Sequence, residues 1–341
     1  MVMKRLCALI TALILLGTTV SSLPARRRRY DAVFSFGDSF ADTGHPTGRN
    51  SDGRLIIDFI AEELGLPLVP PFLAHNGSFR HGANFAVSGA TALGAAFFAD
   101  LPRVSLFVRD TSSSVQLRWF ESLKPSLCSS AHECKGFFKN SLFFMGEFGV
   151  NDYGFSASIG KSLPQIRSLV PDVIKTISAA TENSEGRGKD GVVVPGVPPL
   201  GCAPSNLVQF PSVDPEGYDS RAGCLKQFND LAMHLNSLLQ EAIKNVQTKH
   251  RNVRVIYADF FTPIIRMIES PHKFGFNRDI LRCCCGGGGN YNFNSSAGCG
   301  TPGSTLCDEP SAYLYWDGHL TEAASRHIAR SWLNSINNRH V

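Results

Sequence analysis

The chain of 341 residues is predicted to form an α/β fold in which helices cover both faces of a parallel sheet. Apolar runs of strand length recur along the chain, and segments with the apolar spacing of helices lie between them. This alternation is typical of parallel sheets that are buried on both faces. No Pro/Ser-rich or charge-rich linker interrupts residues 30–337, so we expect them to form a single domain.

Five short apolar runs are the strand candidates: residues 31–36, 83–87, 141–145, 191–194 and 253–257. A first helical face follows the three-and-four spacing of apolar residues between Leu55 and Leu64. A second and longer one runs from Leu225 to Ile243. Residues 182–190 are polar and predict a surface loop. Residues 283–303 carry seven glycines and predict an irregular loop that depends on disulfides for order.

The N-terminal residues 1–22 have the features of a secretory signal peptide. Lys4 and Arg5 precede an apolar stretch from Leu6 to Leu16, and small residues follow it at 20–22. The alternative is an uncleaved anchor, but this stretch is shorter than the ~20 residues that a membrane-spanning helix needs. We therefore expect cleavage, a basic leader at 23–29 and secretion. Extracellular, vacuolar and other secretory-pathway destinations stay open.

The formal net charge of +4 belongs to the N-terminus rather than to the predicted domain. Six positive charges and no acidic residue lie in residues 1–29, so the remaining chain carries a formal charge of −2. Composition therefore gives no support for nucleic-acid binding. No later segment could span a bilayer, so stable membrane insertion is not expected, and the sequence leaves the oligomeric state unknown.

The cysteine content is typical of an oxidising compartment. Nine of the ten cysteines lie outside the signal peptide. Cys128 and Cys134 are close enough in sequence to close a small loop, and so are Cys202 and Cys224. A second cluster contains the remaining five: Cys283, Cys284, Cys285, Cys299 and Cys307. A zinc site is disfavoured because adjacent cysteines rarely present tetrahedral ligands and no histidine lies at the usual spacing.

Two asparagines, Asn76 and Asn294, stand in Asn-x-Ser acceptor sequences for glycans. If the chain is secreted, both are candidates for N-glycosylation.

Three separated residues suggest nucleophilic catalysis. Ser39 follows the apolar run 31–36, at the carboxyl end of a predicted strand, which is where chemistry collects in open α/β sheets. Asn151 follows another apolar run, and His319 lies near the C-terminus. A serine hydroxyl needs a base to take its proton, and a developing oxyanion needs donors. On its own Ser39 could be a turn residue that caps the next segment.

Four segments together resemble the plant branch of the GDSL esterases and lipases, the SGNH hydrolases. They are Gly-Asp-Ser-Phe at 37–40, residues 84–91, Gly-Val-Asn-Asp at 149–152 and Trp-Asp-Gly-His at 316–319. Residues 51–59, 194–202 and 284–289 support the resemblance, which covers nearly all of the predicted domain. It implies a three-layer α/β/α sandwich around a flavodoxin-like, five-stranded parallel sheet. It also implies that Cys283 is the unpaired cysteine.

The resemblance assigns roles to the candidate residues. Ser39 would be the nucleophile and His319 its base, while the Ser39 and Gly89 N–H groups and the Asn151 amide would form the oxyanion hole. Asp38 and Asp152 are interpreted as structural acceptors that hold these turns. No metal or organic cofactor is expected.

The final segment departs from the family pattern, because Asp317-Gly318-His319 is one residue shorter than Asp-x-x-His. Asp317 is the candidate third member of a catalytic triad. Side chains two residues apart share a face in extended backbone but not in a helix. The nearby helix start favours the second case, so we expect the carboxylate to lie out of reach and a Ser39–His319 dyad to operate.

A second departure follows Gly44, where the family has a longer loop before Thr47-Gly48-Arg49 and where His45 replaces a common asparagine. That loop would border the acyl site, so we expect altered substrate binding there.

The predicted function is a secreted serine hydrolase that cleaves small-molecule or lipid carboxylic esters through an acyl-enzyme. An acyltransferase would use the same residues with an alcohol in place of water. A non-catalytic secreted binding protein with a decayed site is the alternative from a different class. Both departures favour it, and the intact Ser39, Gly89 and Asn151 oppose it.

Overall fold

The computed structural model describes residues 29–44, 48–74, 77–99, 110–184 and 191–338. The predicted signal peptide, residues 23–28 of the leader, His45, Thr47 and Asn76 lie outside the described residues.

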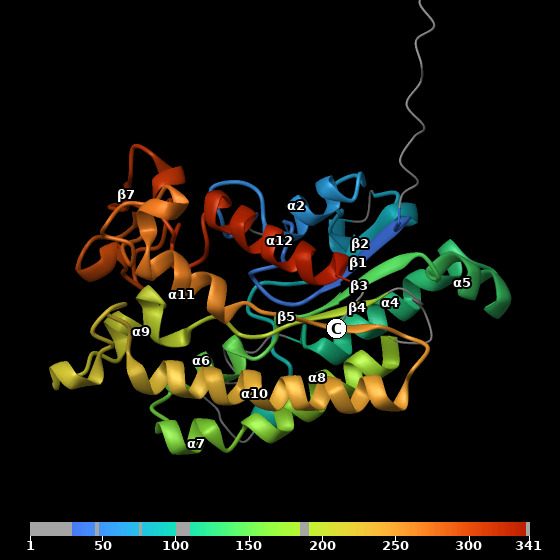
Figure 1. Cartoon of the computed structure of the whole chain (residues 1–341), viewed down its shortest axis with the longest axis horizontal. Coiled ribbons are helices and arrows are strands. Elements are labelled where there is room, and N and C mark those ends of the chain that lie inside the picture. Colours follow the sequence, from blue (N-terminus) through green and yellow to red (C-terminus); the bar gives the residue numbers. More distant parts are fainter. Residues whose placement is uncertain (1–28, 45–47, 75–76, 100–109, 185–190, 339–341) are drawn as a thin grey trace, which may run out of the picture.

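A five-stranded parallel sheet forms the centre of the molecule (Figure 1). Its strand order is β2-β1-β3-β4-β5. The bounds are β1 (Ala32–Phe36), β2 (Gly82–Asn84), β3 (Ser141–Met145), β4 (Val192–Pro195) and β5 (Val255–Ala258). All five predicted strands are therefore present, and the predicted parallel α/β architecture is confirmed.

Helices cover both faces of this sheet (Figure 1). One face packs against α2 (Ile56–Glu63) and α12 (Glu322–Asn337); the other packs against α4 (Ser113–Leu127), α8 (Val170–Ser184) and α10 (Lys226–Lys249). The remaining α-helices are α5 (Ala131–Phe138), α6 (Val150–Ser158), α7 (Leu163–Arg167), α9 (Pro204–Gln209) and α11 (Phe261–Glu269). The result is the three-layer arrangement that the resemblance implied.

The core sits between the sheet and these helices because the strands are apolar on both sides. Every residue of β1, β3 and β4 is buried. Helix α10 buries the apolar face that its spacing predicts, including Leu231, Leu235 and Leu239. No helix in the described ranges combines the length and apolarity needed to cross a membrane.

Strand β2 is shorter than the predicted run 83–87. The backbone nevertheless continues beside β1, since Phe85 N–H donates to Ser35 O at 2.7 Å and Val87 N–H donates to Gly37 O at 3.2 Å. These contacts bring the segment that contains Gly89 to the same end of the sheet as Ser39.

Four disulfides are present in the described chain. Cys128–Cys134 and Cys202–Cys224 close the two small loops expected from sequence. Cys284–Cys307 and Cys285–Cys299 lie in a compact segment that contains the short antiparallel pair β6 (Cys285–Gly286) and β7 (Thr305–Leu306). Among the described cysteines, Cys283 is the free one, and it is buried, as the resemblance implied.

Candidate active site

Ser39 lies in the turn that follows β1, at the carboxyl end of the sheet. Gln116 of α4 fixes the start of this turn, because its amide accepts from Gly37 N–H at 2.8 Å and donates to Gly37 O at 2.8 Å. Asp38 Oδ1 accepts from Phe40 N–H at 3.0 Å. The Ser39 side chain is thereby held at the surface of a cavity, with a residue exposure of 8%.

The structure joins Asp317 to His319. Asp317 Oδ1 lies 2.8 Å from His319 Nδ1 and accepts from the His319 backbone N–H at 3.2 Å. The expectation that the shortened segment would carry this carboxylate out of reach is therefore wrong. This contact can orient the His319 ring, which is what the acid does in a serine–histidine–acid triad.

The local backbone explains the difference. Helix α12 begins only at Glu322, where the Thr321 side chain caps it by accepting from Ala324 N–H. His319 is thus outside the helix, in a tight turn closed by a 2.8 Å bond from Trp316 N–H to His319 O. Gly318 takes φ +107°, a conformation that other residues rarely adopt. This turn lets side chains two residues apart meet.

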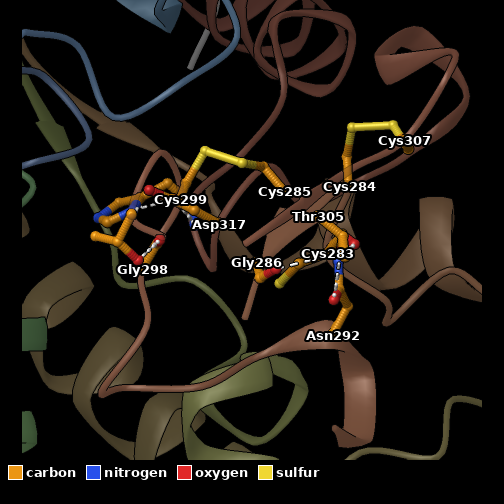
Figure 2. The surroundings of a disulfide bond; sticks show 12 residues. Cys283, Cys284, Cys285, Gly286, Asn292, Gly298, Cys299, Thr305, Cys307 and Asp317 are labelled. Carbon is orange, nitrogen blue, oxygen red and sulfur yellow. Dashed lines mark hydrogen bonds and ion pairs between the residues drawn. A yellow bond between two sulfur atoms is a disulfide. The ribbon is translucent and has the colours of Figure 1, made fainter. Parts of the chain in front are cut away.

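The disulfide-rich segment supports the same turn. Cys284 N–H donates to Tyr315 O at 2.9 Å and Cys285 N–H donates to Trp316 O at 2.7 Å. Tyr315 and Trp316 directly precede Asp317, and Figure 2 shows Asp317 with the Cys285–Cys299 and Cys284–Cys307 disulfides. Two cross-links therefore stabilise the backbone that leads into the turn with Asp317 and His319.

The two partners shift each other's pKa. Burial opposes ionisation of Asp317, but the hydrogen bond and charge of His319 outweigh it and hold the Asp317 pKa below its ordinary value. Burial likewise disfavours the charged imidazole, but the bond to Asp317 and the Asp317 charge raise the His319 pKa above its ordinary value. The geometry favours an ionised Asp317 that stabilises protonated His319.

Ser39 and His319 line the same cavity, and the Phe40 ring packs against the imidazole with ring centroids 5.5 Å apart. Among the described residues, no hydrogen bond joins Ser39 Oγ to the imidazole. Such bonds are often long in substrate-free enzymes and tighten when substrate binds.

The three donors of the expected oxyanion hole differ in availability. Gly89 takes φ +82°, and neither its N–H nor that of Ser39 donates to a described acceptor. Asn151 Nδ2 donates to Asp38 Oδ2 at 2.8 Å and to Ala90 O at 2.9 Å. Both hydrogens of this amide are thus directed at protein acceptors.

Asp38 and Asp152 act as the structural acceptors that the sequence suggested. Asp152 accepts from Ala92 N–H at 2.8 Å and from Leu93 N–H at 3.0 Å, which fixes the segment after Gly89. Burial raises the pKa of Asp152 to about 7 and that of Asp38 to about 6, against the opposing effect of the backbone N–H groups.

The cavity has a volume of about 290 Å³. Its walls include five aromatic residues and three polar residues of α9: Phe40, Tyr153, Phe155, Phe228, Phe293, Ser205, Asn206 and Gln209. This size lies at the lower edge of the range for ligand pockets. The site can enclose one short or medium-sized apolar group next to Ser39.

Sequence reasoning missed Gln116 and Glu147, both buried at this end of the sheet. Gln116 gave no signal because it comes from a helix far along the chain. Glu147 could have been found from the strands, since it follows β3 at the same distance as Asp38 follows β1. Asn294 is exposed, and its Oδ1 accepts from Ser296 N–H at 2.9 Å.

Comparisons with known proteins match nearly the whole chain. A model of the GDSL-like lipase/acylhydrolase family matches residues 33–332. A GDSL esterase/lipase of Arabidopsis thaliana is 42% identical over 346 residues, which cover 94% of this chain and 85% of that protein. The sinapine esterase of Brassica napus is 41% identical over 343 residues, which cover 92% and 88%. The matched range 33–332 spans Ser39, Asn151 and His319.

Proposed function

The chain belongs to the family of GDSL-like lipases and acylhydrolases and is a carboxylic ester hydrolase, and we propose that it works through an acyl-enzyme on Ser39. Its substrates are small-molecule esters. The observation that carries the mechanism is the 2.8 Å contact between Asp317 Oδ1 and His319 Nδ1 in the cavity that also contains Ser39.

In the proposed first step Ser39 Oγ attacks the ester carbonyl while His319 Nε2 takes the hydroxyl proton. Asp317 keeps the proton of the neutral imidazole on Nδ1, so that Nε2 is free to act as base. His319 then gives its proton to the leaving alcohol. Water repeats the sequence on the acyl-enzyme, releases the acid and regenerates Ser39.

The oxyanion would be held first by the Ser39 and Gly89 N–H groups, which have no described acceptor. Asn151 would add its amide by giving up the bond to Ala90 O, since an ionised oxygen is a stronger acceptor than a neutral carbonyl. The bond from Asn151 to Asp38 would stay in place and anchor the amide during this exchange.

A fluorophosphonate probe tests the proposal, because it labels activated serines. Wild-type protein should be labelled and should hydrolyse p-nitrophenyl esters, whereas Ser39→Ala should show neither property. The panel should include sinapine, which the Brassica napus relative is named for. Persistent turnover by folded Ser39→Ala would overturn the assignment. Adding a competing alcohol would reveal acyl transfer as a new ester product.

We also propose that the protein is secreted, extracellularly or to another compartment of the secretory pathway. Four disulfides fit an oxidising environment. Intact-mass analysis of protein from a eukaryotic host should give an N-terminus near Leu23 and glycans on Asn76 or Asn294. A mass that retains Met1 and lacks sugar would refute the proposal.

A further inference from the structure

Two buried carboxyl groups meet behind the nucleophile. Phe36 of β1 pairs in register with Met145 of β3, so Asp38 and Glu147 each lie two residues beyond a matched strand end. The backbones are close there, since a Cβ on Gly37 would lie 3.2 Å from Glu147 N. Asp38 is 0% exposed and Glu147 is 2% exposed.

The hydrogen bonds of the pair leave one buried carboxyl oxygen without a donor. Glu147 Oε1 accepts from Val150 N–H at 3.3 Å, whereas no described group donates to buried Glu147 Oε2. Asp38 already accepts from Phe40 N–H and from the Asn151 amide. Two neighbouring carboxyl groups repel each other when both are ionised, so a single proton between them at neutral pH satisfies both groups.

We propose that Glu147 is a positioning residue for the oxyanion site: its carboxylic acid donates to Asp38, and Asp38 in turn holds the Asn151 amide. The inference rests on the proposed function of Ser39. Glu147 itself touches neither substrate nor nucleophile. It acts by keeping Asp38 an ionised, fully bonded acceptor, which is the anchor that Asn151 needs when it turns toward the oxyanion.

The surrounding charges place the proton on Glu147. Burial and the neighbouring Asp38 charge raise the Glu147 pKa well above its ordinary value, with Asp152 adding to the effect, while Asp38 is raised only to about 6. His319 lowers the Asp38 pKa and Asp42 raises it. At neutral pH the pair therefore contains ionised Asp38 and neutral Glu147.

A double-mutant cycle with Asn151 separates positioning from a structural role. Glu147→Ala should lower kcat with little change in KM, up to the roughly 10²–10³-fold that loss of an oxyanion donor costs. In an Asn151→Ala background the same substitution should cost no further kcat, because the group it positions is gone. Equal losses in both backgrounds would overturn the proposal. Glu147→Gln keeps a donor and should retain most of the activity.

The pH profile gives a second readout that does not depend on the alanine variant folding. Wild-type kcat should fall at alkaline pH, when Glu147 ionises beside Asp38, and Glu147→Gln should lack this fall. Tyr153, whose hydroxyl is also buried near Glu147, has a pKa well above its ordinary value and titrates later. An unchanged alkaline fall in Glu147→Gln would refute the inference.

A matched control comes from α6, the helix that carries Asn151. Ser156→Ala removes a buried hydroxyl of α6 that has no described partner, and it should leave both kcat and the pH profile unchanged. The activity of Ser39→Ala separates a failure of the proposed function from a failure of the positioning role. If that substitution has no effect, the proposed function fails, whereas additive Glu147 and Asn151 effects with an essential Ser39 refute only the positioning role.

Discussion

Replacing Asp317 by asparagine tests the geometry of the shortened turn. The introduced amide would donate to His319 Nδ1 across the 2.8 Å contact, which moves the imidazole proton to Nε2 and removes the base. In a serine triad this tautomer change costs about 10⁴-fold in kcat, or about 5.4 kcal/mol of activation free energy. We expect a loss of this order, since the asparagine is isosteric and the turn remains closed by backbone bonds.

The same substitution should move the acid limb of the pH profile. Asp317 raises the His319 pKa, and only neutral His319 can accept the serine proton. Wild-type kcat/KM therefore falls as pH drops through this raised pKa. Asp317→Asn removes the stabilising charge, so the midpoint of its residual activity should move to lower pH. Steady-state kinetics from about pH 5 to 9 on one p-nitrophenyl ester measures both effects.

Inserting a valine between Gly318 and His319 is the complementary test of the shortened turn. The insertion restores the family spacing, but it breaks the bond from Trp316 N–H to His319 O and displaces a histidine that already contacts its acid. We expect kcat to fall. Three results together would indicate a Ser39–His319 dyad and refute the triad: a kcat loss below about tenfold in Asp317→Asn, an unchanged acid limb of its pH profile, and a higher kcat in the insertion variant. Thermal unfolding checks that both variants fold.

Three further outcomes follow from the site. Gly89→Ala should lower kcat more than it raises KM, because φ +82° strains an alanine and shifts an oxyanion donor; steady-state kinetics measures the split. The double substitution Cys285→Ser/Cys299→Ser should lower both kcat and the melting temperature, because the Cys285–Cys299 disulfide supports the backbone before Asp317. The control Cys283→Ser removes the buried free thiol and should leave kcat near that of the wild type. A cavity of about 290 Å³ should give the highest kcat/KM on short or medium acyl chains across a graded p-nitrophenyl ester series, and a maximum on long chains would contradict a site of this size.

The sheet could be predicted from sequence because its central strands β1, β3 and β4 are buried throughout and lie in apolar runs. β1 and β3 match their predicted runs within a residue. β2 ends earlier, at Asn84, although Phe85 N–H and Val87 N–H still donate to Ser35 O and Gly37 O. Apolarity marks which segment lies beside a strand, whereas the end of regular pairing depends on where the backbone starts to turn.

The sequence predicted the site residues that directly follow a strand. It missed those whose place depends on contacts between distant segments. Ser39 and Asn151 follow β1 and β3, so the strand pattern placed them at one edge of the sheet. The Gln116 clamp on Gly37 comes from a helix, and no local pattern predicts which helical residue faces a distant glycine. The pairing of Asp38 with Glu147 requires the register between two strands.

The Asp317–His319 contact shows why a motif can lose a residue and keep its geometry. The sequence argument assumed that the helix start sets the conformation at His319. The turn is instead held from both sides, by Cys285 N–H on Trp316 O before it and by Thr321 N–H on Leu314 O after it. With both ends fixed, the chain between them must close within four residues, and Gly318 supplies the backbone conformation that allows this. The spacing of acid and base is therefore set by the supports of the turn, and the number of residues between them can change as long as those supports remain.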